Sequence, residues 1–149
     1  MTGSMAPHDS DPSAEDLAFL ERFEACRLPE SEWTHLAHIR VAWVCLCLSP
    51  PAAALDRIRC GILRYNTKVL GRPEMYHETV TEAFTRLVAD RMRSGETWHS
   101  FALRIGDLTD RNAPVLLRYY SRERLGSDEA RRSFVEADLG ELPDLAGGT

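Results

Sequence analysis

Two histidines stand close together in a segment whose spacing suits metal or substrate binding. In the sequence WTHLAH at 33–38, His35 and His38 are three residues apart. Residues three apart lie on the same face of a helix, one turn from each other. Both imidazoles could therefore reach one metal ion or one substrate, and neutral imidazole is a frequent ligand near pH 7. The spacing lacks the glutamate of H-E-x-x-H, so it is not a zincin motif.

A second segment, YHET at 76–79, contributes another histidine with a glutamate beside it. His77 precedes Val80 by three residues and Phe84 by seven. This spacing places His77 on the inward, apolar face of an expected helix. Glu78 is turned about 100° away, where it could orient a ligating histidine or itself become a ligand.

The helices expected to carry these histidines should run parallel. A helix at 34–48 and another at 73–93 are separated by a third that begins near Pro51, which would lie antiparallel between them. Their N-terminal ends would then meet at one end of the bundle, where helix dipoles favour an anionic group. The intervening helix would return Tyr65 and Asn66, two polar residues on its apolar inner face, to the same end. Buried polar groups need partners, so these two either satisfy each other or line a pocket.

These observations predict a small metal-dependent enzyme that acts on a small organic molecule. Three nitrogen ligands with open positions suit a catalytic site rather than a closed structural one. The ion would be a divalent transition metal, with iron, zinc, copper and nickel all open. The expected metal ligands are His35, His38 and His77. The expected catalytic residues are His77, Glu78, Tyr65, Asn66 and Arg40.

Other interpretations of the same residues stay open. Each histidine could be a structural residue that is hydrogen-bonded to a carbonyl or a carboxylate. Arg40, surrounded by apolar neighbours, could pair with an acidic residue or bind a substrate carboxylate. The pocket could also work without metal, with His77 or Glu78 as general acid or base. A non-catalytic ligand-binding or adaptor domain is the further alternative.

The surrounding pattern is helical throughout. Apolar residues recur at helical spacing, and no stretch shows the alternation and β-branched enrichment of strands. Ser13 can cap a first helix, which ends before Pro29, and Ser127 can cap the last. Three short helices are expected near 98–105, at 113–120 and from 127. The sequence predicts an all-α fold, an irregular bundle of six to seven helices in a single domain at 14–140. Residues 1–13 are expected to be a disordered leader and 141–149 a loose tail.

Composition narrows the class of protein. A chain of 149 residues with 44% hydrophobic and 28% charged residues fits one globular domain. A net charge of −5 argues against a nucleic-acid partner. The longest apolar run, at 41–48, is too short to span a bilayer, and the start of the chain lacks a signal-peptide pattern. We therefore expect a cytoplasmic protein with four free cysteines and a small-molecule substrate, with no prediction of oligomeric state.

Three segments together resemble a family of small, uncharacterised bacterial proteins. They are WTHLAHIRVAW at 33–43, YHETVTEAF at 76–84 and RYYSRERLGSDEARRSF at 118–134. The resemblance covers about residues 15–137 and is carried by the W-x-H-x-x-H and Y-H-E-T segments. It implies a self-contained helical unit of bacterial type, and it brings no activity or cofactor with it.

Overall fold

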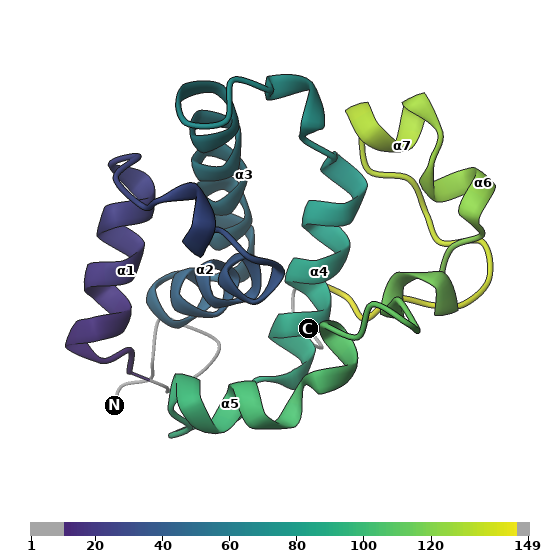
Figure 1. The fold of residues 1–149 in the computed structure, drawn as a ribbon. Helices are drawn as coiled ribbons and strands as arrows, with labels where there is room; N and C mark the ends of the chain where they lie inside the picture. Colours follow the sequence, from purple (N-terminus) through teal and green to yellow (C-terminus); the bar gives the residue numbers. More distant parts are fainter. Residues whose placement is uncertain (1–10, 146–149) are drawn as a thin grey trace.

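The computed structural model describes residues 11–145 and shows an all-α domain (Figure 1). The described residues contain α-helices, short 3-10 turns and no strands, which confirms the predicted fold class. The α-helices are α1 (Ala14–Glu24), α2 (His35–Leu48), α3 (Pro51–Lys68), α4 (Glu78–Arg91), α5 (Trp98–Arg104), α6 (Arg122–Leu125) and α7 (Asp128–Arg132). The 3-10 turns are η1 (Glu30–Glu32), η2 (Pro73–Met75), η3 (Gly106–Leu108) and η4 (Val115–Arg118).

Hydroxyl side chains fix where several helices begin. Ser13 accepts a hydrogen bond from the Asp16 amide, and Asp16 accepts one from the Ser13 amide in return, which forms a capping box. The Thr34 hydroxyl caps α2 by accepting from the Ala37 amide, and the Ser127 hydroxyl caps α7 by accepting from the Ala130 amide. These starts confirm the predicted ones, because a side-chain oxygen satisfies an amide that the helix itself cannot.

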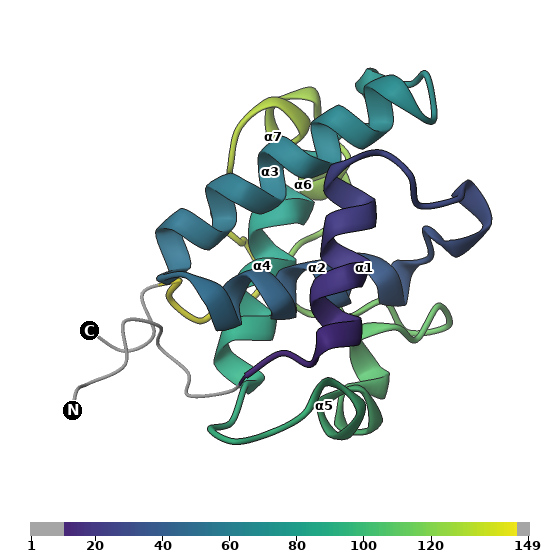
Figure 2. The ribbon, with the colours of Figure 1, turned by 90° about the vertical axis from the view of Figure 1, so that its left-hand side faces the viewer.

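The central helix is α2, which is buried on almost all sides. Every residue from Val41 to Cys47 is buried, and α2 packs against α1, α3 and α4. Cys45 and Cys47 are free thiols, and burial raises the pKa of each to about 12. Figure 2 shows α2 lying across α1 and α4. The expected parallel arrangement of α2 and α4 is therefore wrong.

Two expected helices differ from the observed ones. The segment expected to be helical from Pro73 forms the short turn η2, and α4 begins only at Glu78. The expected helix at 113–120 is the 3-10 turn η4, and α6 was not expected at all. In both places an extended residue interrupts the helical path: Tyr76 has ψ 139° and Pro114 has ψ 124°.

The C-terminal segment covers one side of α4. Figure 1 shows α6 and α7 beside α4, on the side away from α1, and α7 packs on α4. The Thr79 hydroxyl donates to the Ser133 carbonyl at 2.9 Å, and the Tyr120 hydroxyl donates to the Val135 carbonyl at 2.7 Å. Residues 141–145 contain no helix, while 1–10 of the expected leader and 146–149 of the expected tail lie outside the described residues. Within 11–145, no helix has the length and apolar character needed to cross a membrane.

Candidate functional site

Three adjoining hollows lie along α4 and together form what we call the α4 groove. The middle hollow, about 200 Å³, shares His35 and Phe84 with an outer hollow of about 450 Å³. It shares His38 and Thr81 with a third, the α3 hollow, of about 360 Å³. Val80 lines all three. Two of the predicted histidines therefore stand where the hollows meet.

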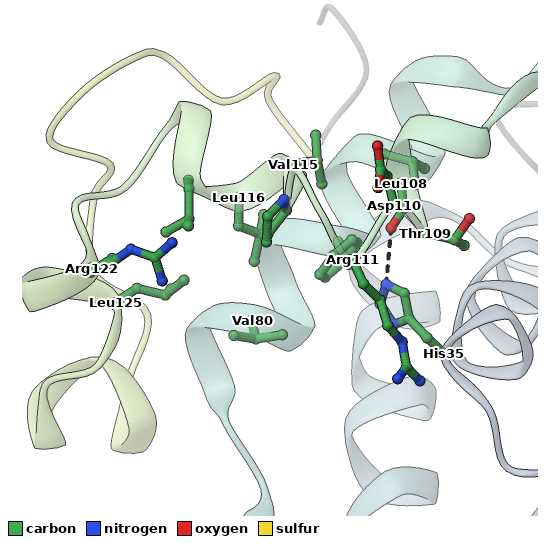
Figure 3. A pocket seen from close by; sticks show the side chains of 13 residues that line it. His35, Val80, Leu108, Thr109, Asp110, Arg111, Val115, Leu116, Arg122 and Leu125 are labelled. Carbon is green, nitrogen blue, oxygen red and sulfur yellow. Dashed lines mark hydrogen bonds between the residues drawn. The ribbon is translucent and has the colours of Figure 1, made fainter.

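His35 and His38 lie near each other and are each held by a backbone carbonyl. His35 Nε2 lies 2.9 Å from the Leu108 carbonyl oxygen, the contact drawn in Figure 3. His38 Nδ1 lies 2.7 Å from the Thr34 carbonyl oxygen. A carbonyl can only accept, so the nitrogen that faces it carries the hydrogen. In the neutral rings, His35 Nδ1 and His38 Nε2 therefore keep a lone pair, and neither atom has a hydrogen-bond partner among residues 11–145.

The surroundings of His38 favour its neutral form. Its ring stacks on Trp33 with the ring centroids 3.7 Å apart. Burial lowers the pKa of His38 to about 4, against the opposing effect of the bond to Thr34, and nearby His35 lowers it further. At neutral pH, His38 is therefore an uncharged acceptor at the meeting point of two hollows.

His77 has a different role from the one expected. It is the N-cap of α4: its Nδ1 accepts from the Val80 amide at 3.1 Å, and its Nε2 donates to the Leu125 carbonyl at 2.8 Å. Burial lowers the pKa of His77, which maintains the acceptor nitrogen that capping requires. The expectation that His77 lies inside α4 is wrong. Its ring touches the α3 hollow, but both nitrogens are already used.

Glu78 is held by two neighbours at the start of α4. Arg59 donates to both carboxylate oxygens, with contacts of 2.5 to 3.0 Å, and the Tyr76 hydroxyl donates to Oε1. Burial raises the pKa of Glu78, but the hydrogen bonds from Arg59 and Tyr76 outweigh it, and the net pKa is lowered. Glu78 is thus an ionised partner in a structural cluster and lines none of the three hollows.

Of the two polar residues predicted on α3, one is structural and the other faces the groove. The Tyr65 hydroxyl donates to the Leu28 carbonyl at 2.7 Å, and the residue is fully buried. Asn66 is 5% exposed and lines the α3 hollow. Its side-chain amide bonds to none of the described residues. We expected Tyr65 and Asn66 either to satisfy each other or to line a pocket. Asn66 lines a pocket, whereas Tyr65 bonds to the backbone.

Arg40 lies away from the groove. It donates to Asp16 Oδ1 through Nη2 at 2.7 Å and through Nε at 3.2 Å, and its guanidinium lies 4.6 Å from the centre of the Phe19 ring. Asp16 is 3% exposed. This is the structural pairing that the sequence left open for Arg40, and it joins α1 to α2.

The structure brings together only part of the expected metal centre. In the described part of the chain, no group of three or more histidine, cysteine or acidic side chains is arranged to hold a metal ion. His35 and His38 do adjoin, with ring centroids 6.4 Å apart. An ion about 2 Å from a nitrogen of each ring would lie about 3.2 Å from each ring centroid. Because the two centroids are 6.4 Å apart, the ion would have to lie nearly on the straight line between them. Two histidines alone are therefore poorly disposed for the tetrahedral geometry of zinc.

The sequence did not reveal the outer hollow. Figure 3 shows its lining, with Arg111 and Arg122 on opposite sides and Val80 between them. Most of the other side chains around it are apolar. Residues 108–125 form this hollow through irregular turns, and such turns give no periodic signal in a sequence.

Comparison of the chain with protein-family models, with curated proteins and with solved structures finds no match. The site must therefore be interpreted from its own geometry.

Proposed function

We propose that the protein binds a small, largely apolar organic molecule in the α4 groove without the help of a metal ion. The observation that carries the proposal is Asn66. The residue as a whole is 5% exposed, it lines a hollow, and its side-chain amide is unbonded within the described chain. The amide therefore has unused hydrogen-bonding capacity, both as donor and as acceptor, that a ligand in this hollow can engage.

The rest of the groove suits the same kind of molecule. The walls of the middle hollow are mainly aliphatic, from Ile39, Ala42, Ile58 and Ile62. Ligand sites are commonly apolar clefts with a few polar groups that fix orientation. Here these groups are the Asn66 amide and the free nitrogens of His35 and His38. A ligand that donates to the histidines and both donates to and accepts from Asn66 would satisfy all three.

Binding is better supported than acid–base catalysis. A general base works best with a pKa near the operating pH. The pKa of His38, about 4, is well below that range. His77 and Glu78, the two residues expected to act as general acid or base, are engaged in capping and in the cluster with Arg59.

The test uses ω-phenylalkanamides, which join an apolar body to a neutral amide. In two-dimensional ¹H–¹⁵N NMR, 4-phenylbutanamide should shift the backbone signals of Val80 and Thr81 and the side-chain amide of Asn66. At about 0.3 kcal/mol per non-hydrogen atom, the Kd should be on the order of 1 mM. Asn66→Leu should weaken binding several-fold, whereas Asn112→Leu, a change at an exposed residue outside the hollows, should leave it unchanged. If none of the chain lengths from four to eight carbons shifts the groove signals, the proposal is wrong.

A metal-dependent enzyme is the second candidate, and one observation favours it. His35 and His38 each donate one ring N–H to a backbone carbonyl and keep the other nitrogen free. Ligating histidines are held in this way. The ion would need further ligands from substrate or water. Elemental analysis of tag-free protein tests the idea: absence of metal, together with no change in melting temperature when iron, zinc, copper or nickel is added, would exclude it.

A further inference from the structure

We infer that the ligand of the α4 groove is an apolar primary amine. Its ammonium group lies between His35 and His38 and donates its third N–H to the side-chain oxygen of Asn66. This inference rests on the proposed function and adds the chemical class of the ligand. It follows from the hydrogen-bonding groups that the middle hollow presents and from the separation of its two histidine rings.

The polar side chains of the middle hollow are two histidines and two threonines, and all of them have already given a hydrogen to the backbone. Each histidine ring donates to a backbone carbonyl, as described above. The Thr81 hydroxyl donates to the His77 carbonyl at 2.9 Å, and the Thr85 hydroxyl donates to the Thr81 carbonyl at 2.8 Å. Among the described side chains of this hollow, acceptors remain and donors do not. A polar group bound here must therefore supply the hydrogens.

The separation of the two histidine rings fits a nitrogen that donates to both. A donor atom about 2.9 Å from each free ring nitrogen, in line with its lone pair, would lie about 4.1 Å from each ring centroid. Because the centroids of His35 and His38 are 6.4 Å apart, the two hydrogen bonds would meet at the donor at about 100°. This is close to the tetrahedral angle between the N–H bonds of an ammonium group. The same separation would force a shared metal ion into a nearly linear geometry.

The third N–H of the ammonium group would face the α3 hollow, which His38 also lines. An ammonium group has three donors and no acceptor, so a buried one needs an acceptor for each N–H. The unbonded amide of Asn66 lines this hollow and offers its oxygen. The two histidines and Asn66 together provide one acceptor for each hydrogen.

The charged residues around these two hollows also favour a cation. The exposed Glu30 carboxylate lines the α3 hollow and makes no ion pair with any residue in 11–145. No lysine or arginine of that range lines the middle or the α3 hollow. Because burial lowers the pKa of His38 to about 4, the amine meets a lone pair there and not a second positive charge.

The apolar body of the ligand would extend from the histidines into the outer hollow. Phe84 lines both the middle hollow and the outer one, so the two are continuous at its ring. Figure 3 shows Val80, Leu116 and Leu125 around the outer hollow, which has a volume of about 450 Å³. This volume is within the size range of small-molecule sites.

The test compares three probes at pH 7.5 by the NMR titration described above: 4-phenylbutylamine, 4-phenylbutanamide and (4-phenylbutyl)trimethylammonium. The amine should bind about fivefold more tightly than the amide, as expected when hydrogen bonds become charge-assisted. The trimethylammonium ion has the charge of the amine but no N–H, so it should bind no more tightly than the amide. In the wild type, the amine should also shift the ring ¹⁵N signals of His35 Nδ1 and His38 Nε2, and the trimethylammonium ion should not.

Variants locate the ammonium group. His38→Phe keeps an aromatic ring and removes the acceptor, so the preference for the amine over the amide should fall below about twofold. The matched control His99→Phe, at an exposed position that lines none of the hollows, should keep the full preference. Asn66→Leu should weaken binding of the amine several-fold, whereas Asn112→Leu should leave it unchanged.

The outcomes separate the two proposals. If the amide binds in the groove and the amine binds no better, the amine assignment is wrong and the proposed function stands. If the trimethylammonium ion binds as tightly as the amine, charge alone is recognised and the assignment is again wrong. Full amine affinity in Asn66→Leu, or an unchanged preference in a folded His38→Phe, would likewise overturn it. If no probe of any chain length binds, the proposed function itself fails.

Discussion

Acidification should destabilise the protein through His38, because the folded structure holds its imidazole neutral. The pKa of His38 falls from 6.5 to about 4 on folding, chiefly through burial. Its ring stacks on Trp33. Above pH 6.5, the ring is neutral in both the folded and the unfolded chain, and its contribution to stability is fully present. As the pH falls from 6.5 towards 4, only the unfolded chain takes up the proton, so the free energy of unfolding decreases.

The size of the effect follows from the width of this window. Each pKa unit corresponds to about 1.4 kcal/mol, so a window from 6.5 to about 4 gives an upper limit of about 3 kcal/mol. His77, whose pKa is also lowered, adds a loss in the same direction. The contribution of His38 must therefore be taken as a difference between the wild type and a variant that lacks the titrating ring.

His38→Phe is the suitable variant, since a phenyl ring can keep the stacking on Trp33 and cannot titrate. Urea unfolding followed by tryptophan fluorescence at pH values from 7.5 to 4.5 gives the free energy of unfolding for each protein. The difference between wild type and His38→Phe should be constant above pH 6.5 and should shrink steadily below it. The control is His99→Phe, which makes the same substitution at an exposed position of α5. A difference that stays flat down to pH 4.5 would refute the reasoning.

Three further changes, at His77, Gly61 and Glu78, are tested by urea unfolding at pH 7.5. His77→Ala should lower the free energy of unfolding by about 2 kcal/mol, about half from the lost cap and half from the lost bond to the α6 carbonyl. His77→Asn keeps the cap and should lower it by about half as much. Equal losses in the two variants would contradict the capping role. Gly61→Ala should cost about 1–3 kcal/mol, because its Cβ would lie 2.6 Å from the Phe23 ring; a neutral result would show that the ring moves aside freely. Glu78→Gln should lower the free energy of unfolding by about 2 kcal/mol, because it weakens the charged hydrogen bonds from Arg59. An unchanged stability would argue that water already screens this ion pair.

The sequence predicted the parts of the fold that depend on local chemistry. Ser13 and Thr34 mark helix starts because the cap and the amides that it satisfies lie within three residues. The buried character of α2 follows from its composition alone. The start of α4 could not be found in this way: the inward spacing of His77 from Val80 fits a helical residue and a cap equally well. Only the contact with Leu125, 48 residues further on, separates the two.

The site was predictable to the same limited degree. Helical spacing placed His35 and His38 together, and the inner face of α3 drew attention to Asn66, which the structure leaves facing the groove. The crossing of α2 over α4 depends on how whole faces pack, and no local pattern encodes it.

His35, His38 and His77, the three histidines that line the α4 groove, differ in whether the fold uses one ring nitrogen or two. His77 uses both, so a ligand that engaged it would have to break the cap of α4 or the link to α6. His35 and His38 use one each and can offer the other without disturbing the fold. The same distinction separates Tyr65, which is bonded, from Asn66, which is not. His35, His38 and Asn66 all border the α4 groove, and their unused hydrogen-bonding capacity is the physical reason for placing the ligand there.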